Sequence, residues 1–281
     1  MGTFEEQAPY VAPDVLYKYR GFENRGRVLK MITEGEIWFA SPGGFNDPFD
    51  MAIHYDYNTD IKTYRKWLLD VCRTDNPNAN RQQRRMIIDD ALRKFRRKQF
   101  QMQADLKRHH DATILKSFGV CCMAEPHDDI LMWAHYAQNH AGICVGFDTN
   151  DLIETCKVRF TFGKLLGFLP ITYAEEMPLI PFYEYSLKRR TMGAQEGFRL
   201  LTTKSAHWGY EREVRLLSWQ ETDFTLRAGR EAVREVYLGC RVNADDKREV
   251  LEALERVGST AAVYQARTQE RRFALAFDKI R

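Results

Sequence analysis

A helical and basic segment at residues 60–112 interrupts a sequence that otherwise favours short strands. Its apolar side chains recur at helical spacing, and the polar run 74–80 divides it in two, so the segment predicts an inserted helical hairpin. In the rest of the chain strand-like runs dominate, and most of the expected helices lie between strands that are far apart in sequence. We therefore predict an α+β fold, with residues 1–281 forming a single domain around the insertion.

Short apolar runs and helix-end signals place the other elements. Gly35 follows a helical pattern and is expected to end it, and Asp128 or Asp129 is expected to cap a short helix that starts at Ile130. Strands are expected at residues 15–19, 36–40, 117–123, 143–147, 166–173, 213–219, 233–238 and 261–267 or 272–277. Helices are expected at residues 23–33, 130–140, 183–200 and 243–257.

The composition is that of an ordinary globular domain. Of the 281 residues, 44% are hydrophobic and 29% charged, and no stretch reaches the roughly twenty apolar residues that span a bilayer. Residues 1–14 lack the features of a secretory signal, so we expect a cytoplasmic protein that does not contact a membrane. The six cysteines are scattered without CxxC spacing, which indicates a reducing compartment and argues against a zinc site.

Positive charge is concentrated in one part of the insertion. The whole chain has 42 Lys and Arg against 39 Asp and Glu, and this net charge of +3 is too small to indicate a nucleic-acid partner. Residues 81–108, in contrast, hold ten Lys or Arg against three Asp, a local net charge of +7. Such a run is usually a solvated helix face. The alternative is a surface that binds nucleic acid or another acidic partner, and the sequence leaves both interpretations open.

Two glutamates separated by one residue precede a late apolar strand. On a strand, Glu211, Glu213 and Arg215 would share one face, because alternate side chains point to the same side. Two carboxylates at this spacing repel each other unless a positive group lies between them. If that group is a structural cation such as Arg215, the two glutamates belong to a strand face whose charges are balanced. If it is a bound substrate, the two glutamates form a catalytic site.

The first expected strand carries a cationic face. Lys18 and Arg20 share one side of it, and Tyr17 and Tyr19 share the other. A cationic face can hold a phosphate, since Lys acts as a point charge and Arg as a two-pronged donor. The alternative is an edge strand that uses charge to avoid pairing with other chains.

Polar residues elsewhere are further candidates to contact a ligand. In the turn-rich loop 41–50, Asn46 and Asp47 precede Pro48 and favour either a self-bonded turn or a recognition loop. Lys204, which precedes the two glutamates, is expected to neutralise them or to contact a phosphate. No GxxxxGK[ST] or GxGxxG motif occurs, so the usual nucleotide-binding loops are absent from the sequence.

Trp133, His135 and Tyr136 crowd one turn of an expected helix. His135 can act as an acid, a base or a ligand, although a lone His on an apolar helix is more often a packing residue. Tyr136 can stack on a flat ring or belong to the core. No metal is expected, because the spacing of the available ligands is unspecific even in the combination of His135 and Glu213 with Asp47 or Asp50.

Taken together, these motifs resemble a bacterial family known only as a domain of unknown function. The resemblance extends from about residue 15 to about residue 240. It rests on LYKYR at 16–20, IWFASPGGFNDPFD at 37–50, HDDILMWAHYAQNHAGICVGFD at 127–148, LTTKSAHWGYEREVRL at 201–216 and VYLG at 236–239.

The order of the motifs also resembles, more distantly, the ADP-ribosyltransferase superfamily. Those enzymes have a His or Arg on a first strand, an aromatic or Ser motif in the middle, and a catalytic Glu, often in Glu-x-Glu, at the start of a late strand. The resemblance implies a mixed, split β-sheet core and NAD as the substrate. It implies that Glu213 stabilises the positive charge that develops on the ribose as nicotinamide leaves, and that Glu211 orients or activates the acceptor.

The resemblance also implies further site residues. His135 is an additional catalytic candidate. The implied contacts to NAD are made by Lys18, Tyr19, Arg20, Asn46, Asp47, Trp133, Tyr136 and Lys204.

The function implied is an NAD-consuming transferase or glycohydrolase that acts as a toxin or phage-defence effector on nucleic acid or protein. Two alternatives remain open. One is a nucleic-acid-binding or nuclease-like protein that uses residues 81–108. The other is a non-catalytic interaction domain in which Arg215 balances the acidic pair.

Overall fold

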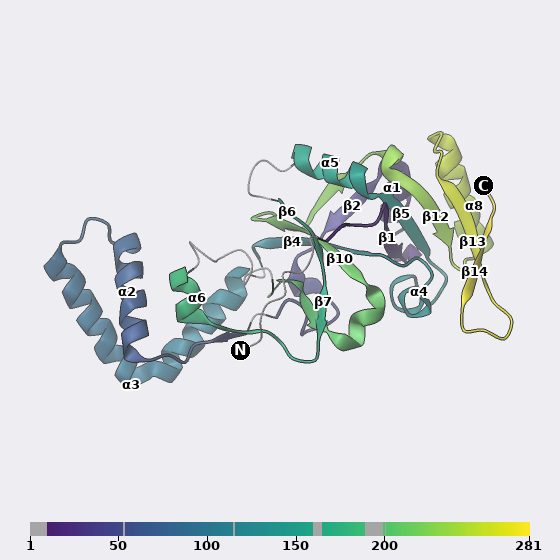
Figure 1. Ribbon diagram of the computed structural model, residues 1–281. Helices are drawn as coiled ribbons and strands as arrows, with labels where there is room; N and C mark the ends of the chain where they lie inside the picture. The colour runs from purple at the N-terminus through teal and green to yellow at the C-terminus, as the bar shows by residue number, and fades with distance from the viewer. Residues whose placement is uncertain (1–9, 53, 115, 160–164, 189–198, 200) are drawn as a thin grey trace. The chain divides into compact units, whose positions relative to one another are not determined.

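The chain forms two compact units, shown in the computed structural model of Figure 1. The first unit consists of residues 1–44, 116–173 and 206–281, and the second of residues 45–115 and 174–205. The structure describes residues 10–52, 54–114, 116–159, 165–188, 199 and 201–281. Within these residues no helix combines the length and the apolar character needed to cross a membrane.

An eight-stranded mixed sheet forms the frame of the first unit. Its strand order is β14-β13-β12-β5-β1-β4-β10-β6. The β12 and β13 strands run parallel, and the other neighbours in this sheet run antiparallel. The strands are β1 (Val15–Arg20), β4 (Phe118–Ala124), β5 (Ile143–Asp148), β6 (Leu165–Pro170), β10 (Glu213–Trp219), β12 (Val233–Leu238), β13 (Ala262–Thr268) and β14 (Leu275–Lys279). The predicted α+β fold with a mixed sheet is confirmed.

The sheet has a seam between β1 and β4. The β1 strand pairs with β5 at six positions, and β4 pairs with β10 at seven, whereas β1 and β4 pair only at Tyr17 and Ala124. Next to that pair, the Lys18 ammonium donates a hydrogen bond to the carbonyl oxygen of Cys122. The Lys18 side chain thus satisfies a β4 carbonyl at a place where the two strands do not pair, and the sheet consists of two well-paired halves joined at one point.

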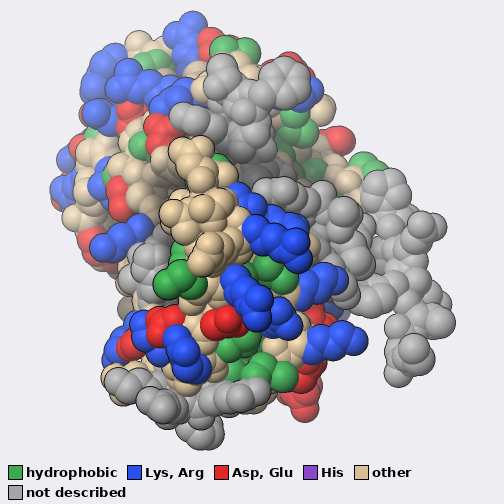
Figure 2. All heavy atoms as spheres, turned by 90° about the vertical axis from the view of Figure 1, so that its left-hand side faces the viewer, with side chains coloured by type: hydrophobic (Ala, Val, Ile, Leu, Met, Phe, Trp, Pro, Cys, Tyr) green, Lys and Arg blue, Asp and Glu red, His purple; other side chains and the backbone are tan. Residues whose placement is uncertain are grey.

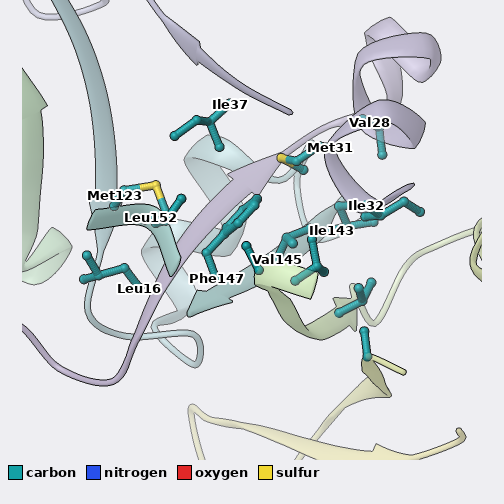
Figure 3. Packing of buried hydrophobic residues seen from close by; sticks show 14 of the residues in the cluster. Leu16, Val28, Met31, Ile32, Ile37, Met123, Ile143, Val145, Phe147 and Leu152 are labelled. Carbon is teal, nitrogen blue, oxygen red and sulfur yellow. The ribbon is translucent and has the colours of Figure 1, made fainter. Parts of the chain in front are cut away.

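Apolar side chains pack on both faces of this sheet. On one face, the helices α1 (Arg25–Glu34), α5 (Thr149–Arg159) and α8 (Ala244–Arg256) cover a core that contains Leu16, Ile32 and Leu152 (Figure 3). On the opposite face, the short helix α4 (Ile130–Tyr136) packs Met132 and Trp133 against β1 and β5. The sheet therefore separates a large aliphatic core from a smaller, mostly aromatic one.

Local signals in the sequence set the ends of two of these helices. The Asn24 side chain accepts a hydrogen bond from the Arg27 amide at the start of α1, and Gly35 ends α1 with a left-handed φ of 63°. The Asp129 carboxylate accepts from the amides of Leu131 and Met132 at the start of α4. The end of α1 at Gly35 and the start of α4 at Asp129 agree with the sequence-based prediction.

The remaining elements of the first unit are short. The β2 strand (Glu36–Phe39) pairs antiparallel with β11 (Phe224–Arg227), and β7 (Thr172–Ala174) follows β6. The 3-10 segments are η1 (Phe22–Asn24), η2 (Pro42–Gly44), η3 (Ala206–Glu211) and η4 (Arg230–Ala232).

The second unit contains the predicted helical hairpin. Its helices are α2 (Ile61–Asp75) and α3 (Arg81–Ile114), close to the expected range 60–112. The Asp60 side chain caps α2 by accepting from the amides of Lys62 and Thr63. The unit also contains β3 (His54–Asp56), which runs parallel to β8 (Leu179–Pro181), together with α6 (Phe182–Lys188) and β9 (Thr203–Ser205).

An aromatic core holds the hairpin and α6 together. The Tyr64 ring stacks on the Phe95 ring with centroids 3.9 Å apart, and Tyr183 from α6 meets the Tyr64 ring edge-on at 5.4 Å. Since Tyr64 lies on α2 and Phe95 on α3, these rings fix the two helices against each other.

Some elements differ from the expected ones. Residues 149–159 form α5, which the sequence analysis did not anticipate, and both expected ranges near the C-terminus are strands, β13 and β14. The helix expected at 183–200 corresponds to α6 only as far as Lys188, and residues 189–198 and 200 of that expectation lie outside the described residues.

Candidate functional site

The two glutamates do not lie on one strand. Glu211 is the last residue of η3, and Glu213 is the first residue of β10. Arg212 between them has a left-handed φ of 39°, a conformation that is rare for a non-glycine residue and breaks the strand alternation. The expectation that Glu211, Glu213 and Arg215 share one strand face is therefore wrong for Glu211 and correct for the other two.

Glu213 and Arg215 form a buried ion pair. Arg215 Nε lies 2.6 Å from Glu213 Oε1, and its terminal nitrogen lies 3.3 Å from Oε2. The exposed fraction is 4% for Glu213 and 0% for Arg215. A charge this deeply buried needs an opposite charge beside it, so this half of the motif has the balanced arrangement that the structural interpretation expects.

Glu211 has a partner in a different motif. The hydroxyl group of Tyr136, at the end of α4, donates a 2.6 Å hydrogen bond to Glu211 Oε1. Glu211 is 3% exposed, whereas Tyr136 is partly exposed. The contact joins two residues that are 75 positions apart in the chain and connects the aromatic helix motif with the acidic motif.

Exposed and partly exposed rings lie beside this contact. The ring centroids of His135, Trp208 and Tyr210 lie 6.0 to 6.3 Å from one another, and His135 also lies 6.3 Å from Tyr136. We call these four residues the ring group. They present aromatic surface beside a buried carboxylate, and such an arrangement can stack on a flat ligand while an oxygen accepts its hydroxyl protons.

Trp133 and Tyr19 are packing residues. Trp133 is fully buried, its ring meets Tyr19 edge-on with centroids 5.4 Å apart, and its Nε1 donates to the carbonyl oxygen of His127 at 2.8 Å. Tyr19 is also buried, and its hydroxyl donates to the Pro126 carbonyl oxygen. These two predicted site residues join β1 to α4, and neither presents a surface to a ligand.

Lys18 and Arg20 leave β1 on the sheet face opposite to Glu213. Tyr17 pairs with Ala124, and Ala124 pairs with Glu213, so Tyr17 and Glu213 lie on one face of the sheet. Lys18 and Arg20 alternate with Tyr17 and belong to the other face. Arg20 is exposed, and the Lys18 ammonium donates to the Cys122 carbonyl oxygen. Neither cation therefore shares a strand face with Glu213.

Two of the three polar candidates of the second unit are held in local contacts. Asn46 is exposed, and the Asp47 carboxylate accepts a 2.9 Å hydrogen bond from the Phe49 amide, which is the self-bonded turn that the sequence suggested. Lys204 and Asp50 form a buried ion pair at 3.4 Å. Asp47 and Lys204 thus have clear structural roles within that unit.

Sequence reasoning did not assign a role to Trp208 or Tyr210. Their signal was the aromatic pair in Trp208-Gly209-Tyr210 directly before Glu211, but only the fold places these rings beside α4. A second carboxylate was missed in the same way. Glu235 Oε2 accepts from the hydroxyl groups of both Tyr17 and Tyr237, at 3.0 and 2.9 Å.

No metal site emerges from the part of the chain that the structure describes. No group of three or more His, Cys, Asp or Glu side chains there is arranged to hold an ion. All six cysteines are free, and burial raises the pKa of the Cys121 and Cys144 thiols and that of Cys156 to about 12. Thiols with raised pKa values are poor metal ligands and poor nucleophiles.

The region that contains this site matches a family. Residues 132–216 match the model described as "Protein of unknown function (DUF2971)". The matching segment starts in α4 and ends in β10, so it includes the ring group and both glutamates. For this segment, the predicted similarity to a family of unknown function is confirmed. Neither the curated proteins nor the solved structures gave a match to the chain.

Proposed function

We propose that this chain cleaves the bond between nicotinamide and ribose in NAD and transfers ADP-ribose to water or to an acceptor. The observation that carries the proposal is the Tyr136–Glu211 hydrogen bond beside the ring group. It joins the middle and the last motif of the ADP-ribosyltransferase resemblance within one unit. A half-exposed aromatic surface next to a carboxylate matches what a nicotinamide riboside group requires.

The proposed reaction breaks the bond between ribose C1 and the nicotinamide nitrogen. The bonding electron pair leaves with nicotinamide and cancels its positive charge, while positive charge develops on the ribose ring. An oxygen of water or of the acceptor then bonds to C1 and releases its proton. Fixed negative charge close to the ribose lowers the barrier to such a step.

The geometry suggests a division of roles between the two glutamates. Glu211, beside the ring group, would contact the ribose hydroxyls or accept the proton of the attacking oxygen. Glu213, which Arg215 holds in place, would contribute its negative charge from a fixed position. In this assignment the ring group replaces Trp133 as the stacking surface, and the exposed Arg212 replaces Lys18 as the contact to phosphate.

A nicotinamide-release assay tests the proposal. Purified full-length chain would be incubated with NAD labelled separately in the nicotinamide and the adenine, with RNA, DNA and protein acceptors present in parallel samples. We expect nicotinamide release, and a loss of at least 100-fold in Glu211→Gln, as is typical when one transition-state contact is removed. Tyr136→Phe should lower the rate less, because Glu211 keeps its charge.

A matched control separates catalysis from folding. Glu235 also accepts a tyrosine hydroxyl on this sheet but lies on β12, outside the ring group, so Glu235→Gln should keep full turnover. If the folded wild-type chain neither binds NAD nor releases nicotinamide with any acceptor, the proposal is wrong. A non-catalytic interaction domain then becomes the better interpretation.

A further inference from the structure

The net positive charge of this chain lies in the helical hairpin. Residues 61–114 contain 14 Lys or Arg against 6 Asp and no Glu, a net charge of +8. The whole chain has 42 positive against 39 negative residues, a net charge of +3, so the residues outside 61–114 carry −5. The near-neutral total therefore hides a strongly cationic hairpin and a net acidic remainder.

Four cations of α3 are exposed, and each pairs only with a carboxylate on the same helix. The side chains of Arg85, Arg93, Lys94 and Arg108 are 82%, 72%, 66% and 75% exposed. Their partners are Asp89, Asp90 and Asp105 on the same helix, and these carboxylates are themselves about half exposed. Exposed ion pairs of this kind contribute little to stability, so their Lys and Arg side chains can pair with another anion instead.

One stripe of α3 faces the interior of its own unit. Ile88 and Phe95 are buried, and Phe95 belongs to the aromatic core with α2 and α6, so this stripe faces the unit's interior. Positions 85, 96 and 107 are Arg, Arg and Lys at intervals of 11 residues, close to three helical turns, so they recur along one line of the helix. At 34 residues α3 is about 51 Å long. Figure 2 shows Lys and Arg side chains, with fewer acidic ones, on the face that carries the hairpin.

We propose that the α2–α3 hairpin binds nucleic acid through its phosphodiester backbone, without preference for base sequence. A long helix with repeated cations suits a polyanion whose charges repeat along an axis. Phosphate suits the composition as well, since seven of the ten cations in 81–108 are Arg. An acidic protein partner fits less well, because protein interfaces have an apolar centre, and the exposed large apolar residues of the described hairpin are only Ile61, Met86 and Ile87.

This inference does not depend on the proposed NAD chemistry, because it rests on other residues and another unit. Its test is a binding titration of the full chain with fluorescent 30-mer probes of duplex DNA, duplex RNA and single-stranded RNA, each at several salt concentrations. The hairpin variant carries Arg85→Gln, Arg93→Gln, Lys94→Gln and Arg108→Gln. The matched control removes four exposed arginines of the first unit, by Arg248→Gln, Arg256→Gln, Arg267→Gln and Arg272→Gln.

We expect the wild-type chain and the control variant to bind, with affinity falling steeply as salt rises. The hairpin variant should bind at least tenfold more weakly at low salt. For duplex DNA, its log–log salt slope should be smaller by about 0.9 for each removed cation that contacts a phosphate. Circular dichroism and the melting temperature would verify that both variants are folded.

Three results would overturn the inference. The first is no binding of any probe by the folded wild-type chain at low salt. The second is an equal loss of affinity in the control variant, which would indicate a non-specific charge effect. The third is displacement of the probe by polyglutamate at lower charge concentration than by unlabelled nucleic acid, which would assign the surface to an acidic protein.

Discussion

Glu213 and Arg215 are ion-paired on one face of β10, with 2.6 Å between Oε1 and Nε, and both are buried. Replacing Arg215 by Met keeps much of the side-chain volume but removes the positive partner from a buried carboxylate. We expect the free energy of unfolding to fall by about 3–5 kcal/mol, measured by urea denaturation. The double variant Glu213→Gln with Arg215→Met should recover part of this loss, because the buried negative charge is then gone.

An exposed pair provides the control for this prediction. Arg267 and Asp278 are 2.9 Å apart and more than half exposed, so Arg267→Met should change the free energy of unfolding by less than about 1 kcal/mol. If the Arg215 and Arg267 substitutions lowered the free energy of unfolding equally, burial of the ion pair would not determine its contribution to stability.

Tyr136 is expected to contribute to stability as well as to the proposed site. Tyr136→Phe removes the hydroxyl that donates to the buried Glu211 carboxylate, and we expect a cost of about 1–3 kcal/mol. Tyr17→Phe is the comparison, because its partner Glu235 is only partly buried and also accepts from Tyr237. Thermal denaturation of both variants should show the larger decrease for Tyr136→Phe, and a larger decrease for Tyr17→Phe would count against this account.

Gly142, which follows α4, and Gly239, which follows β12, lie where another backbone segment passes very close to them. A Cβ at Gly239 would lie 2.1 Å from the carbonyl oxygen of His140, and a Cβ at Gly142 would lie 2.2 Å from that of Arg20. Either Gly→Ala change should destabilise the chain by about 1–3 kcal/mol or more. Gly44→Ala, with no atom within 4 Å of its Cβ, should cost little in the same melting experiment. Equal melting temperatures for all three variants would show that these close backbone contacts do not require glycine.

Acid should destabilise the first unit through His127. Burial lowers the pKa of His127, although Asp128 and Glu235 act in the opposite direction, and burial with Arg241 lowers that of His140. A histidine with a lowered pKa in the folded state binds fewer protons than the unfolded chain does. The free energy of unfolding should therefore decrease as pH falls below the ordinary histidine pKa of about 6.5 toward the lowered value.

The variant His127→Phe keeps an aromatic ring against Tyr17 and Tyr237 and removes the titrating group. Urea midpoints at pH 7.5 and pH 5.5 should differ less in this variant than in the wild type. An unchanged difference would show that His127 does not carry the acid sensitivity.

The sequence predicted the helices and helix ends that depend only on residues close together in the chain. Gly35 and Asp129 mark helix ends through their own backbone and side-chain chemistry, and the hairpin is evident from apolar spacing within two continuous helices. The α5 helix was missed, although the Asp148 carboxylate accepts from the Asp151 amide at its start, because that residue also ends a strand. In addition, apolar and polar residues are poorly separated on opposite faces of α5, so the sequence there lacks a clear helical pattern.

The site could be predicted only in part. The residue types of the two motifs pointed to Glu211 and Tyr136 separately, but their contact spans 75 positions and depends on how α4 and η3 meet. The strand-face assignment failed for Glu211 because Arg212 adopts a left-handed conformation, which its residue type does not favour and the sequence therefore does not predict. Lys18 looked like a phosphate ligand, yet the seam between β1 and β4 requires a donor at that place.

The uneven charge of the hairpin and the rest of the chain also governs how copies of this protein behave together. At neutral pH each molecule carries a cationic segment of +8 and an acidic remainder of −5. When counterions are scarce, the cationic segment of one copy attracts the acidic remainder of the next, and added salt screens this attraction. The chain is therefore expected to be least soluble in dilute buffer and to dissolve as ionic strength increases, a salting-in behaviour that its small net charge alone does not reveal.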